Sequence, residues 1–493
     1  MNIVILDTVV ELKSIIGSGG TNNSRPAAIV GGYWAIGDGG GGMFYWEISS
    51  SSGDNGVTPT QPGTIIVPTG STSGRWVRVY SGPINVRWFG ARGQGTDIDD
   101  APAINKAISV AGASRAAVFI PRGIYRLDAA LNMSFAFVRL HGEGEGATFL
   151  QKVGTSAETI VFKSTSVGCE VAYLSINPRG DSIQTTGGAI RFSEPMGVAY
   201  IKLSNLLINA FQGIVVEGSG FARGIGTSIS EVTIERIKIH YANKGIKTCY
   251  AINWTLENII LEATVPAEPG SNILGVWIDT ETEGCIFNGI FSLGGEHCWR
   301  IARSINIETN DRGPSENRFY SCIGDNGTVS CIYISSLHRG IFTNCWCSTQ
   351  IETSDAAVVM DNLDIWGVQW VSSQIVNVIG HGIKVLAATS FAIINSTFSE
   401  WNLNNLAHSA VLVHPNARTN FSIIGNQFIR DTDFGTHSNF ATITVTSGKY
   451  NRYIISNNMS YSGTDVLNMG IGALDKVSDA GSAAFSKIVN NNL

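Results

Sequence analysis

The chain has 493 residues, of which 44% are hydrophobic, 15% are charged and 56 are glycine, and its net charge at pH 7 is −6. This low-charge, glycine-rich composition is typical of β-rich proteins. The negative charge and the lack of a Lys/Arg cluster argue against nucleic acid as a partner, because phosphate binding needs concentrated cations.

The N-terminal segment and the cysteines indicate the compartment in which the chain folds. Asp7 and Glu11 interrupt the N-terminal segment where a signal peptide would continue its apolar core, and no run of 18 apolar residues follows. We therefore expect no signal peptide, no membrane insertion, and folding in a reducing cytoplasm. The eight cysteines include no CxxC pair, which favours free buried thiols over a metal or redox site. We predict neither a cofactor nor a metal.

Residues 1–80 are predicted to form a small domain of their own. Two aromatic and glycine-rich stretches mark it, GGYWAIGDGGGGMFYWEIS at 31–49 and GRWVRVYSG at 74–82. The glycine run 39–42 is no phosphate loop, since GxxxxGK[ST] is missing. Both stretches resemble the head domain of phage tailspike proteins, which implies attachment to the phage tail or baseplate. The aromatic side chains are then expected in the core rather than in a sugar site: Tyr33, Trp34, Phe44, Tyr45 and Trp46.

The next segment, 81–127, is predicted to be a neck and the entry to a second architecture. A glycine-rich loop is followed by Asp97, Asp99 and Asp100, which we interpret as ordinary capping of a helix at 99–110. Ala103, Ile104, Ala107 and Ile108 give that helix an apolar side, and 118–120 is a buried strand. The order of these features resembles the entry of the pectate-lyase-like right-handed β-helix superfamily. The matching residues are Phe89-Gly90-Ala91, Gly93, Gly95, Asp99-Asp100, Ala103-Ile104, Ala107-Ile108, Phe119, Pro121, Gly123 and Tyr125.

Residues 128–462 repeat a short phrase, apolar-x-(Asn/Ser)-x-apolar, at irregular intervals. Its central position is occupied by Asn205, Arg236, Asn258, Asn288, Ser321, Asn344, Ser373, Ser396, Asn426 and Asn457. The residues two before and two after are nearly all apolar, so we expect inward-facing strand columns around a polar bend. The predicted fold class is all-β, a right-handed single-stranded parallel β-helix with an internal asparagine-type ladder, a small head, a short capping helix and a short C-terminal cap at 463–493.

Some positions just after the bends are apolar where a solvated face was expected. They are Leu206, Ile208, Ile237, Ile239, Ile259, Leu261 and Phe291. Contiguous exposed apolar residues usually mark an interface, and the tailspike resemblance implies a homotrimer. We therefore expect this face to be buried between three copies of the chain.

A second set of strands is expected to carry the functional surface. One predicted outward column holds Val215, Lys247, Trp277, Arg300, Tyr333, Val359 and Lys384, and the next holds Glu217, Cys249, Asp279, Ala302, Ser335, Asp361 and Leu386. Aromatic rings beside cations and carboxylates suit a long glycan groove. We therefore predict Lys247, Trp277, Arg300, Tyr333 and Asp361 as substrate-binding residues.

Hydrolysis of a glycosidic bond needs two carboxylates, which inverting enzymes hold about 6.5–9.5 Å apart. Glu217 and Asp279 are two coils apart in one column, and Asp279 with Glu281 or Glu283 is an alternative pair. We expect catalytic residues among these four. The resulting hypothesis is a virion tailspike, folded in the host cytoplasm, that binds and cleaves bacterial surface polysaccharide such as capsule or O-antigen. A β-eliminating lyase and a non-catalytic receptor-binding spike remain as alternatives.

Overall fold

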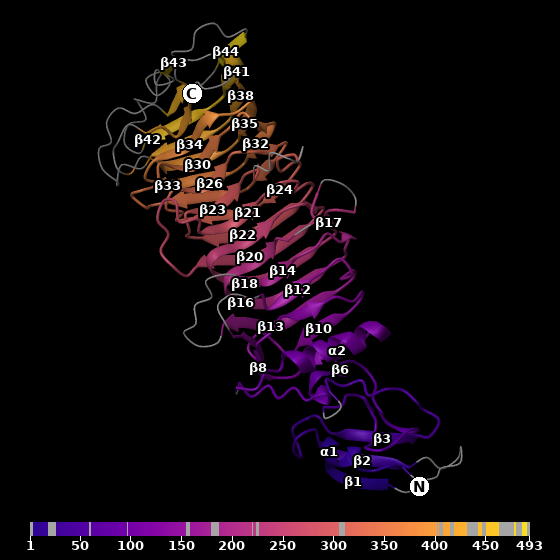
Figure 1. The fold of residues 1–493 in the computed structure, drawn as a ribbon. Helices are drawn as coiled ribbons and strands as arrows, with labels where there is room; N and C mark the ends of the chain where they lie inside the picture. The colour runs from indigo at the N-terminus through magenta and orange to yellow at the C-terminus, as the bar shows by residue number, and fades with distance from the viewer. Residues whose placement is uncertain are drawn as a thin grey trace. The chain divides into compact units, whose positions relative to one another are not determined.

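The structure is a computed structural model that describes residues 3–17, 26–58, 61–95, 97–153, 158–178, 187–218, 220–222, 226–304, 311–401, 403, 408–414, 419–430, 442–445, 450–462, 478–479 and 486–490. It divides into two compact units, Met1–Ala210 and Phe211–Leu493. Strands dominate both units, and Figure 1 labels them in chain order. The predicted domain boundaries at 80, 127 and 462 stay predictions.

The first unit begins with a five-stranded sheet in the order β1-β2-β3-β5-β4. Its elements are β1 (Ile3–Thr8), α1 (Val9–Lys13), β2 (Ala27–Gly32), β3 (Gly42–Glu47), β4 (Ile65–Ile66) and β5 (Arg75–Arg78). Tyr33, Phe44 and Trp46 are buried in its core, as predicted. Trp34 is not, because 38% of it is exposed and its Nε1 donates to the Gly90 carbonyl at 2.9 Å. Tyr45 is half-buried.

The predicted entry helix is α2, which runs from Ala101 to Ser114. It packs against β7 (Ala117–Ile120), β9 (Leu131–Met133) and the short 3-10 helix η1 (Val86–Phe89). Its buried side contains the four predicted apolar residues. The capping interpretation needs a correction. Asp100 stands at the N-cap, but its carboxylate accepts from the N–H groups of Arg92 and Gly93 at 2.6 and 3.1 Å and makes no cap bond to the helix. Asp99 instead accepts from the first helical N–H, that of Ala101.

The remaining strands of the first unit stack in parallel, which confirms the predicted β-helix. For example, β7 pairs with β10, β10 with β13, and β13 with the first part of β16 (Lys202–Val216). The other strands of this unit are β6 (Ile84–Asn85), β7 (Ala117–Ile120), β8 (Gly123–Leu127), β9 (Leu131–Met133), β10 (Arg139–Gly142), β11 (Thr148–Lys152), β12 (Ile160–Phe162), β13 (Glu170–Pro178), β14 (Gly188–Phe192) and β15 (Gly197–Val198).

In the second unit each coil supplies three strand segments, so three parallel ladders run along it. We call them the first, second and third ladder in the order in which a coil visits them. The first and second ladders share the long strands β18 (Thr233–Thr248), β20 (Thr255–Ala263) and β22 (Ile286–Leu293), each bent in the middle. The first ladder continues through β24 (Arg318–Tyr320), β28 (Ile341–Thr343), β32 (Val368–Val371), β35 (Ser390–Ile394), β38 (Thr419–Ile424), β41 (Tyr450–Ser456) and β44 (Ser486–Asn490).

The second ladder continues through β25 (Ile323–Asp325), β29 (Trp346–Thr349), β33 (Gln374–Val378), β36 (Thr397–Trp401), β39 (Gln427–Arg430) and β42 (Met459–Ser462). The third ladder starts with the last part of β18 and comprises β21 (Leu274–Ile278), β23 (His297–Ile301), β26 (Ser330–Ile334), β30 (Ala356–Asp361), β34 (His381–Ala387), β37 (Val411–Val413), β40 (Ile443–Val445) and β43 (Ser478–Asp479). Short strands lie in the connections: β17 (Ile229–Ser230), β19 (Ala251–Ile252), β27 (Leu337–His338) and β31 (Ile365–Trp366).

The bend between the first and second ladders has a left-handed backbone in every coil of the repeat. The bend residues are Asn205, Arg236, Asn258, Gly289, Ser321, Asn344, Ser372, Asn395, Gly425 and Asn457, all with φ between 50° and 69°. Six of the ten predicted positions are correct, and four are wrong by one residue. Asn and Gly tolerate this conformation best, which explains why the repeat is visible in the sequence at all.

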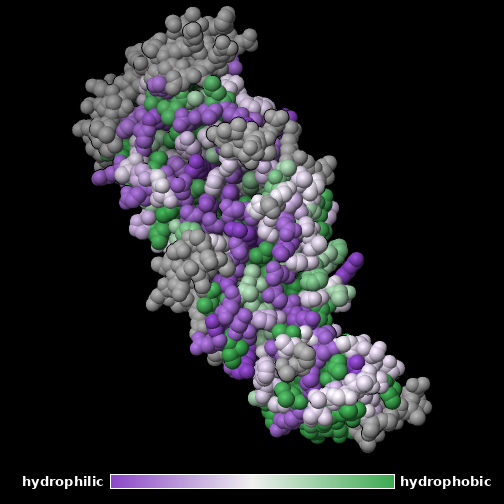
Figure 2. All heavy atoms as spheres, viewed as in Figure 1, coloured by the Kyte–Doolittle hydropathy of each residue, from purple (hydrophilic) through white to green (hydrophobic). Residues whose placement is uncertain are grey.

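The left-handed residue also breaks the alternation of strand side chains, so the residue directly after the bend points inward. Leu206, Ile237 and Ile259 are therefore buried at 0–2% exposure, and Ile208, Ile239 and Leu261 at 0%. Their prediction as an outward apolar face is wrong, because they belong to the core of a single chain. Figure 2 shows hydrophilic residues over much of the face in view, with hydrophobic ones in small separate groups. The homotrimer stays a prediction, but an exposed apolar face no longer supports it.

Further along the chain, polar side chains replace aliphatic ones at the inward position after the bend. Asn426 Nδ2 donates to Asn458 Oδ1 at 3.0 Å, and the Ser396 N–H donates to Asn426 Oδ1 at 2.8 Å. An internal asparagine-type ladder was predicted at the bend residues, and the structure has it one residue after each bend, on Ser396, Asn426 and Asn458. All eight cysteines are free thiols, and seven of them are buried. Burial raises the pKa of Cys169 to about 11 and that of Cys285 to about 12.

Candidate functional site

The predicted column on the third ladder exists as an aligned row of side chains. Lys247 pairs with Trp277, Trp277 with Arg300, and Arg300 with Tyr333 on four neighbouring strand segments. The row continues through Val359 to Lys384. The polar and aromatic members are half-buried, as expected of an outer sheet surface. Val359 stands in this row but is covered, at 8% exposure, and Val215 is fully buried, so neither valine offers surface to a ligand.

The indole ring of Trp277 is surrounded by cations. Lys247 Nζ lies 4.5 Å from the ring centroid, Lys244 Nζ 5.3 Å and Arg300 Cζ 5.6 Å. The negative face of an indole attracts such cations, so the ring fixes their positions. Lys244 was missed in the sequence because it precedes the column by three residues. Burial, followed by the nearby Lys247 charge, lowers the pKa of the Lys244 ammonium.

Lys247 also joins two of the predicted catalytic carboxylates. Its ammonium lies 3.8 Å from Glu217 Oε1 and 3.9 Å from Asp279 Oδ2. These carboxylate oxygens therefore lie no more than about 8 Å apart, an upper limit that is compatible with the carboxylate spacing of glycosidases. The two side chains differ sharply in access, since the Glu217 side chain is 43% exposed and that of Asp279 only 1%.

Asp279 was predicted to face solvent on the outer surface, but its carboxylate is covered and only 1% exposed. Its carboxylate accepts from the N–H groups of Thr280 and Ser304, both at 2.7 Å, and from their hydroxyls at 3.1 and 2.6 Å. Asp279 follows the last residue of β21, where the chain turns away from the ladder, so a turn that closes around the carboxylate buries it. A carboxylate with four donors and an ammonium is well suited to hold a connection in place.

The other predicted carboxylates follow in the same connection. Glu281 is buried, has a left-handed backbone (φ 51°) and accepts from the Arg312 N–H. Glu283 is exposed. Asp311, the residue before Arg312, is also buried, and its carboxylate accepts from the Tyr250 hydroxyl at 2.7 Å. Burial and this contact with Asp311 raise the pKa of Tyr250. Among the four predicted catalytic residues, Glu217 and Glu283 are thus the ones that solvent reaches.

Tyr333 and Asp361 lie further along the third ladder and contact each other. The Tyr333 hydroxyl donates to Asp361 Oδ2 at 3.3 Å, and the ring stacks on His297 with centroids 5.0 Å apart. His297 is buried, and burial lowers its pKa to about 4. The Tyr333 ring therefore packs on the neutral imidazole of His297, and its hydroxyl contacts the exposed carboxylate of Asp361.

The second ladder holds a groove that the sequence did not reveal. Ile260, Phe291, Ile323 and Trp346 stand in register on its outer side, and Ile260 is 44% exposed. The groove has a volume of about 580 Å³ and is lined by Phe291, Ser321, Ile323, Asp325, Asn344, Cys345, Trp346, Ser372 and Gln374. Burial raises the pKa of Asp325. The expected alternation had placed Ile260, Ile323 and Trp346 in the core, and the left-handed bend reverses it.

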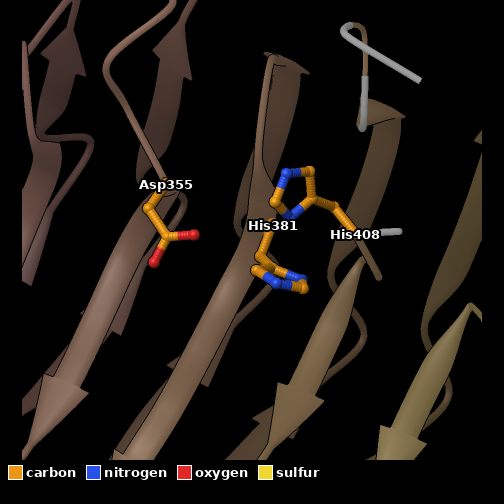
Figure 3. A group of neighbouring side chains, drawn as sticks. All are labelled: Asp355, His381 and His408. Atoms are coloured by element: carbon orange, nitrogen blue, oxygen red, sulfur yellow. The ribbon is translucent and has the colours of Figure 1, made fainter. Parts of the chain in front are cut away.

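One group of side chains has the composition of a metal site. Asp355, His381 and His408 offer ligand atoms within 4.8 Å of one another, and Figure 3 shows the three side chains together. Two contacts count against a cation there. The Lys384 ammonium pairs with Asp355, and His381 Nδ1 accepts from the Ser409 N–H at 2.8 Å. That bond uses the lone pair of Nδ1, so the proton of a neutral imidazole is on Nε2 and neither nitrogen is free to bind metal.

Comparisons with known proteins agree with the fold. Residues 83–178 match the family model "Rhamnogalacturonase A/epimerase, pectate lyase-like", and residues 5–81 match "Phage tail protein small four-stranded beta-sheet domain". Both predicted resemblances are thereby confirmed. No curated protein matches the chain in sequence. Within the described residues, no helix combines the length and apolarity needed to cross a membrane.

Three solved structures illustrate the likeness in fold. The A-module of mannuronan C-5 epimerase AlgE6 from Azotobacter vinelandii has a TM-score of 0.53 at 15% identity, covering 83% of this chain and 98% of the module. The tailspike protein of Acinetobacter phage vB_ApiP_P1 has a TM-score of 0.51 at 14% identity, and the match covers 100% of this chain and 77% of that tailspike. Full-length tailspike protein 2 of Escherichia coli O157:H7 bacteriophage CAB120 also has a TM-score of 0.51, at 14% identity, and the match covers 92% of this chain. The chain spans about half of that protein, 51%.

Proposed function

We propose that the chain is a phage tailspike that binds and cleaves a polysaccharide of the host surface, either capsule or O-antigen. The match of residues 5–81 to a phage tail domain supports attachment of the head to the phage tail. The β-helix fold, shared with tailspikes and with a polysaccharide-modifying enzyme, supports a glycan as the substrate. The observation that carries the proposal is the placement of Lys247 between two carboxylates, beside Trp277, on an outer strand surface.

Glycoside hydrolysis is the reaction that this geometry supports best. Glu217 is the solvent-accessible carboxylate beside Lys247, so it is placed to transfer a proton to the glycosidic oxygen or to take one from water. Asp279 holds Lys247 and the connection after β21, and through them the position of Glu217. Glu283 is the remaining predicted carboxylate with access to solvent, and it is our candidate for the second carboxylate that hydrolysis needs.

A specific observation also favours β-elimination as a second candidate. The cations around Trp277 could neutralise the carboxylate of a uronic acid, which makes the neighbouring C–H more acidic. A base would then remove that proton, and the glycosidic oxygen would leave from the adjacent carbon. The third candidate, a spike that binds without cleaving, needs only the same surface.

One assay separates the three candidates. The full chain is incubated with purified capsules and O-antigens from a panel of bacteria, and the products are analysed. New reducing ends without ultraviolet absorbance indicate hydrolysis, and reducing ends with the absorbance of an unsaturated sugar indicate elimination. Binding without either product indicates a receptor-binding spike. If no polysaccharide of the panel is bound or cut, the proposed function is wrong.

A further inference from the structure

The cations around Trp277 are more numerous than their acidic partners. Three cations lie within 5.6 Å of one ring centroid in a chain whose net charge is −6. Among the residues that the structure describes, only Lys247 of these three has carboxylates at ion-pair distance, Glu217 and Asp279. Within the described residues, Lys244 and Arg300 contact neutral amides instead: Lys244 Nζ donates to Asn243 Oδ1 at 3.1 Å and Arg300 Nη1 to Asn272 Oδ1 at 3.2 Å.

Two buried donors at the same place also lack acceptors among the described residues. Trp277 Nε1 and Arg300 Nε are both buried and, among the described residues, neither has a hydrogen-bond partner. A buried N–H without an acceptor costs about 1–3 kcal/mol, so such donors are usually satisfied by something. Like charges held close together cost further free energy. An anion bound beside these groups would offset the repulsion between the cations.

We propose that the polysaccharide carries an acidic group on its repeating unit, and that Lys244, Arg300 and Trp277 form the subsite that binds this group. The proposal rests on the proposed glycan site, and it does not depend on which reaction follows. The planar guanidinium of Arg300 suits a carboxylate or phosphate oxygen pair, and Lys244 adds a second positive charge from the coil on the other side of Trp277. In this proposal the Trp277 ring positions the cations. The sugar is then held through the charge of its acidic group and not by stacking on the ring.

The substrate itself provides the first test. Each polysaccharide that the chain binds is compared with its carboxyl-reduced form and with its dephosphorylated form, in binding assays at low and high salt. We expect binding of acidic polysaccharides only, and an at least tenfold loss, about 1.4 kcal/mol, when the responsible acidic group is removed. Loss on carboxyl reduction identifies a sugar acid, and loss on dephosphorylation identifies a phosphate. Equal binding of a neutral polysaccharide and its acidic parent would overturn the proposal and leave the proposed function standing.

Variants of the chain provide the second test. Lys244→Met and Arg300→Met keep an unbranched stem and remove the charge, so each should weaken binding of the acidic polysaccharide and reduce its salt dependence. Lys238→Met is the matched control, since Lys238 is an exposed lysine of the second ladder that pairs with Glu262 at 3.7 Å. Unchanged binding in both site variants, with unchanged thermal midpoints, also overturns the proposal. A chain that binds nothing refutes the proposed function itself.

Discussion

The Lys247 ammonium lies 3.9 Å from the carboxylate of Asp279, whose side chain is only 1% exposed. This pair connects the outer surface of the third ladder to the buried turn behind it. The two carboxylates that contact Lys247 therefore have different roles. Glu217 faces solvent and can meet a substrate, while Asp279 supports the connection.

Removal of the Asp279 carboxylate should therefore lower stability. Asp279→Ala leaves the buried N–H groups of Thr280 and Ser304 without their acceptor and Lys247 without one of its two partners. We expect a loss of about 3–5 kcal/mol in the free energy of unfolding, measured by denaturant unfolding. Asp279→Asn keeps one acceptor oxygen and should cost less. A wild-type unfolding midpoint in Asp279→Ala would contradict the structural role.

Substitution of Glu217 should affect catalysis and spare the fold. Glu217→Gln keeps the size of the side chain and removes its proton transfer, which typically contributes about 10²–10⁴-fold in rate. We expect cleavage to fall by that factor while binding and the thermal midpoint stay unchanged, since 43% of the side chain is exposed. Glu283→Gln, tested in parallel, shows whether Glu283 is the second carboxylate. Full activity in Glu217→Gln would refute the assignment of Glu217.

Two buried histidines should make the protein sensitive to mild acid. Burial lowers the pKa of His297 and of His381 to about 4, although Glu296 opposes the shift at His297 and Asp355 opposes it at His381. His408, Arg300 and Lys384 act in the same direction as burial. Above pH 6.5 both folded and unfolded states are neutral at these sites. Between pH 6.5 and 4 the unfolded state takes up protons that the folded state does not, so stability falls by about 3 kcal/mol per histidine.

The measurement is the thermal midpoint as a function of pH. Carboxylates also titrate towards the lower end of this window, so the comparison with variants isolates the imidazoles. His381→Gln and His297→Gln should each remove about half of the histidine contribution. If the slope between pH 6.5 and 5 is the same in the double variant as in the wild type, the two imidazoles do not control it.

The asparagine ladder should be sensitive to a single deletion of its amide. Asn426 is fully buried, donates to Asn458 and accepts from the Ser396 N–H. Asn426→Ala leaves the buried Ser396 N–H without its acceptor and removes one of the two donors to Asn458 Oδ1. It also opens a small cavity, so we expect a loss of about 2–4 kcal/mol. Asn457→Ala is the matched comparison at the adjacent bend, where the cost comes from the left-handed backbone. Equal unfolding midpoints for Asn426→Ala and the wild type would contradict a stabilising ladder.

The architecture could be predicted because its signals are local. Glycines and asparagines mark left-handed bends, aliphatic residues mark buried strands, and α2 shows its apolar side in the sequence. The errors arose where one residue changes the geometry of those that follow. At Gly289 the bend comes one residue after Asn288, and the side-chain alternation shifts with it. A rule of strict alternation cannot include a residue with φ of 61°.

The site was predicted less completely because it depends on contacts between coils. The row Lys247, Trp277, Arg300 and Tyr333 followed from the repeat alone. The burial of Asp279 did not, since it results from a turn that brings Ser304 onto its carboxylate. Lys244 was missed because it stands three residues before the column, and the repeat does not show that its ammonium reaches the Trp277 ring.

The buried thiols have a practical consequence for anyone who studies how this protein unfolds. A thiol reacts with an alkylating reagent only as an accessible thiolate, and burial here suppresses both access and ionisation. Six of the seven buried cysteines, from Cys285 to Cys347, lie in pairs on three successive coils, and Cys169 lies on a much earlier coil. Their order of alkylation under increasing denaturant would therefore record which coils open first, with no label introduced into the chain.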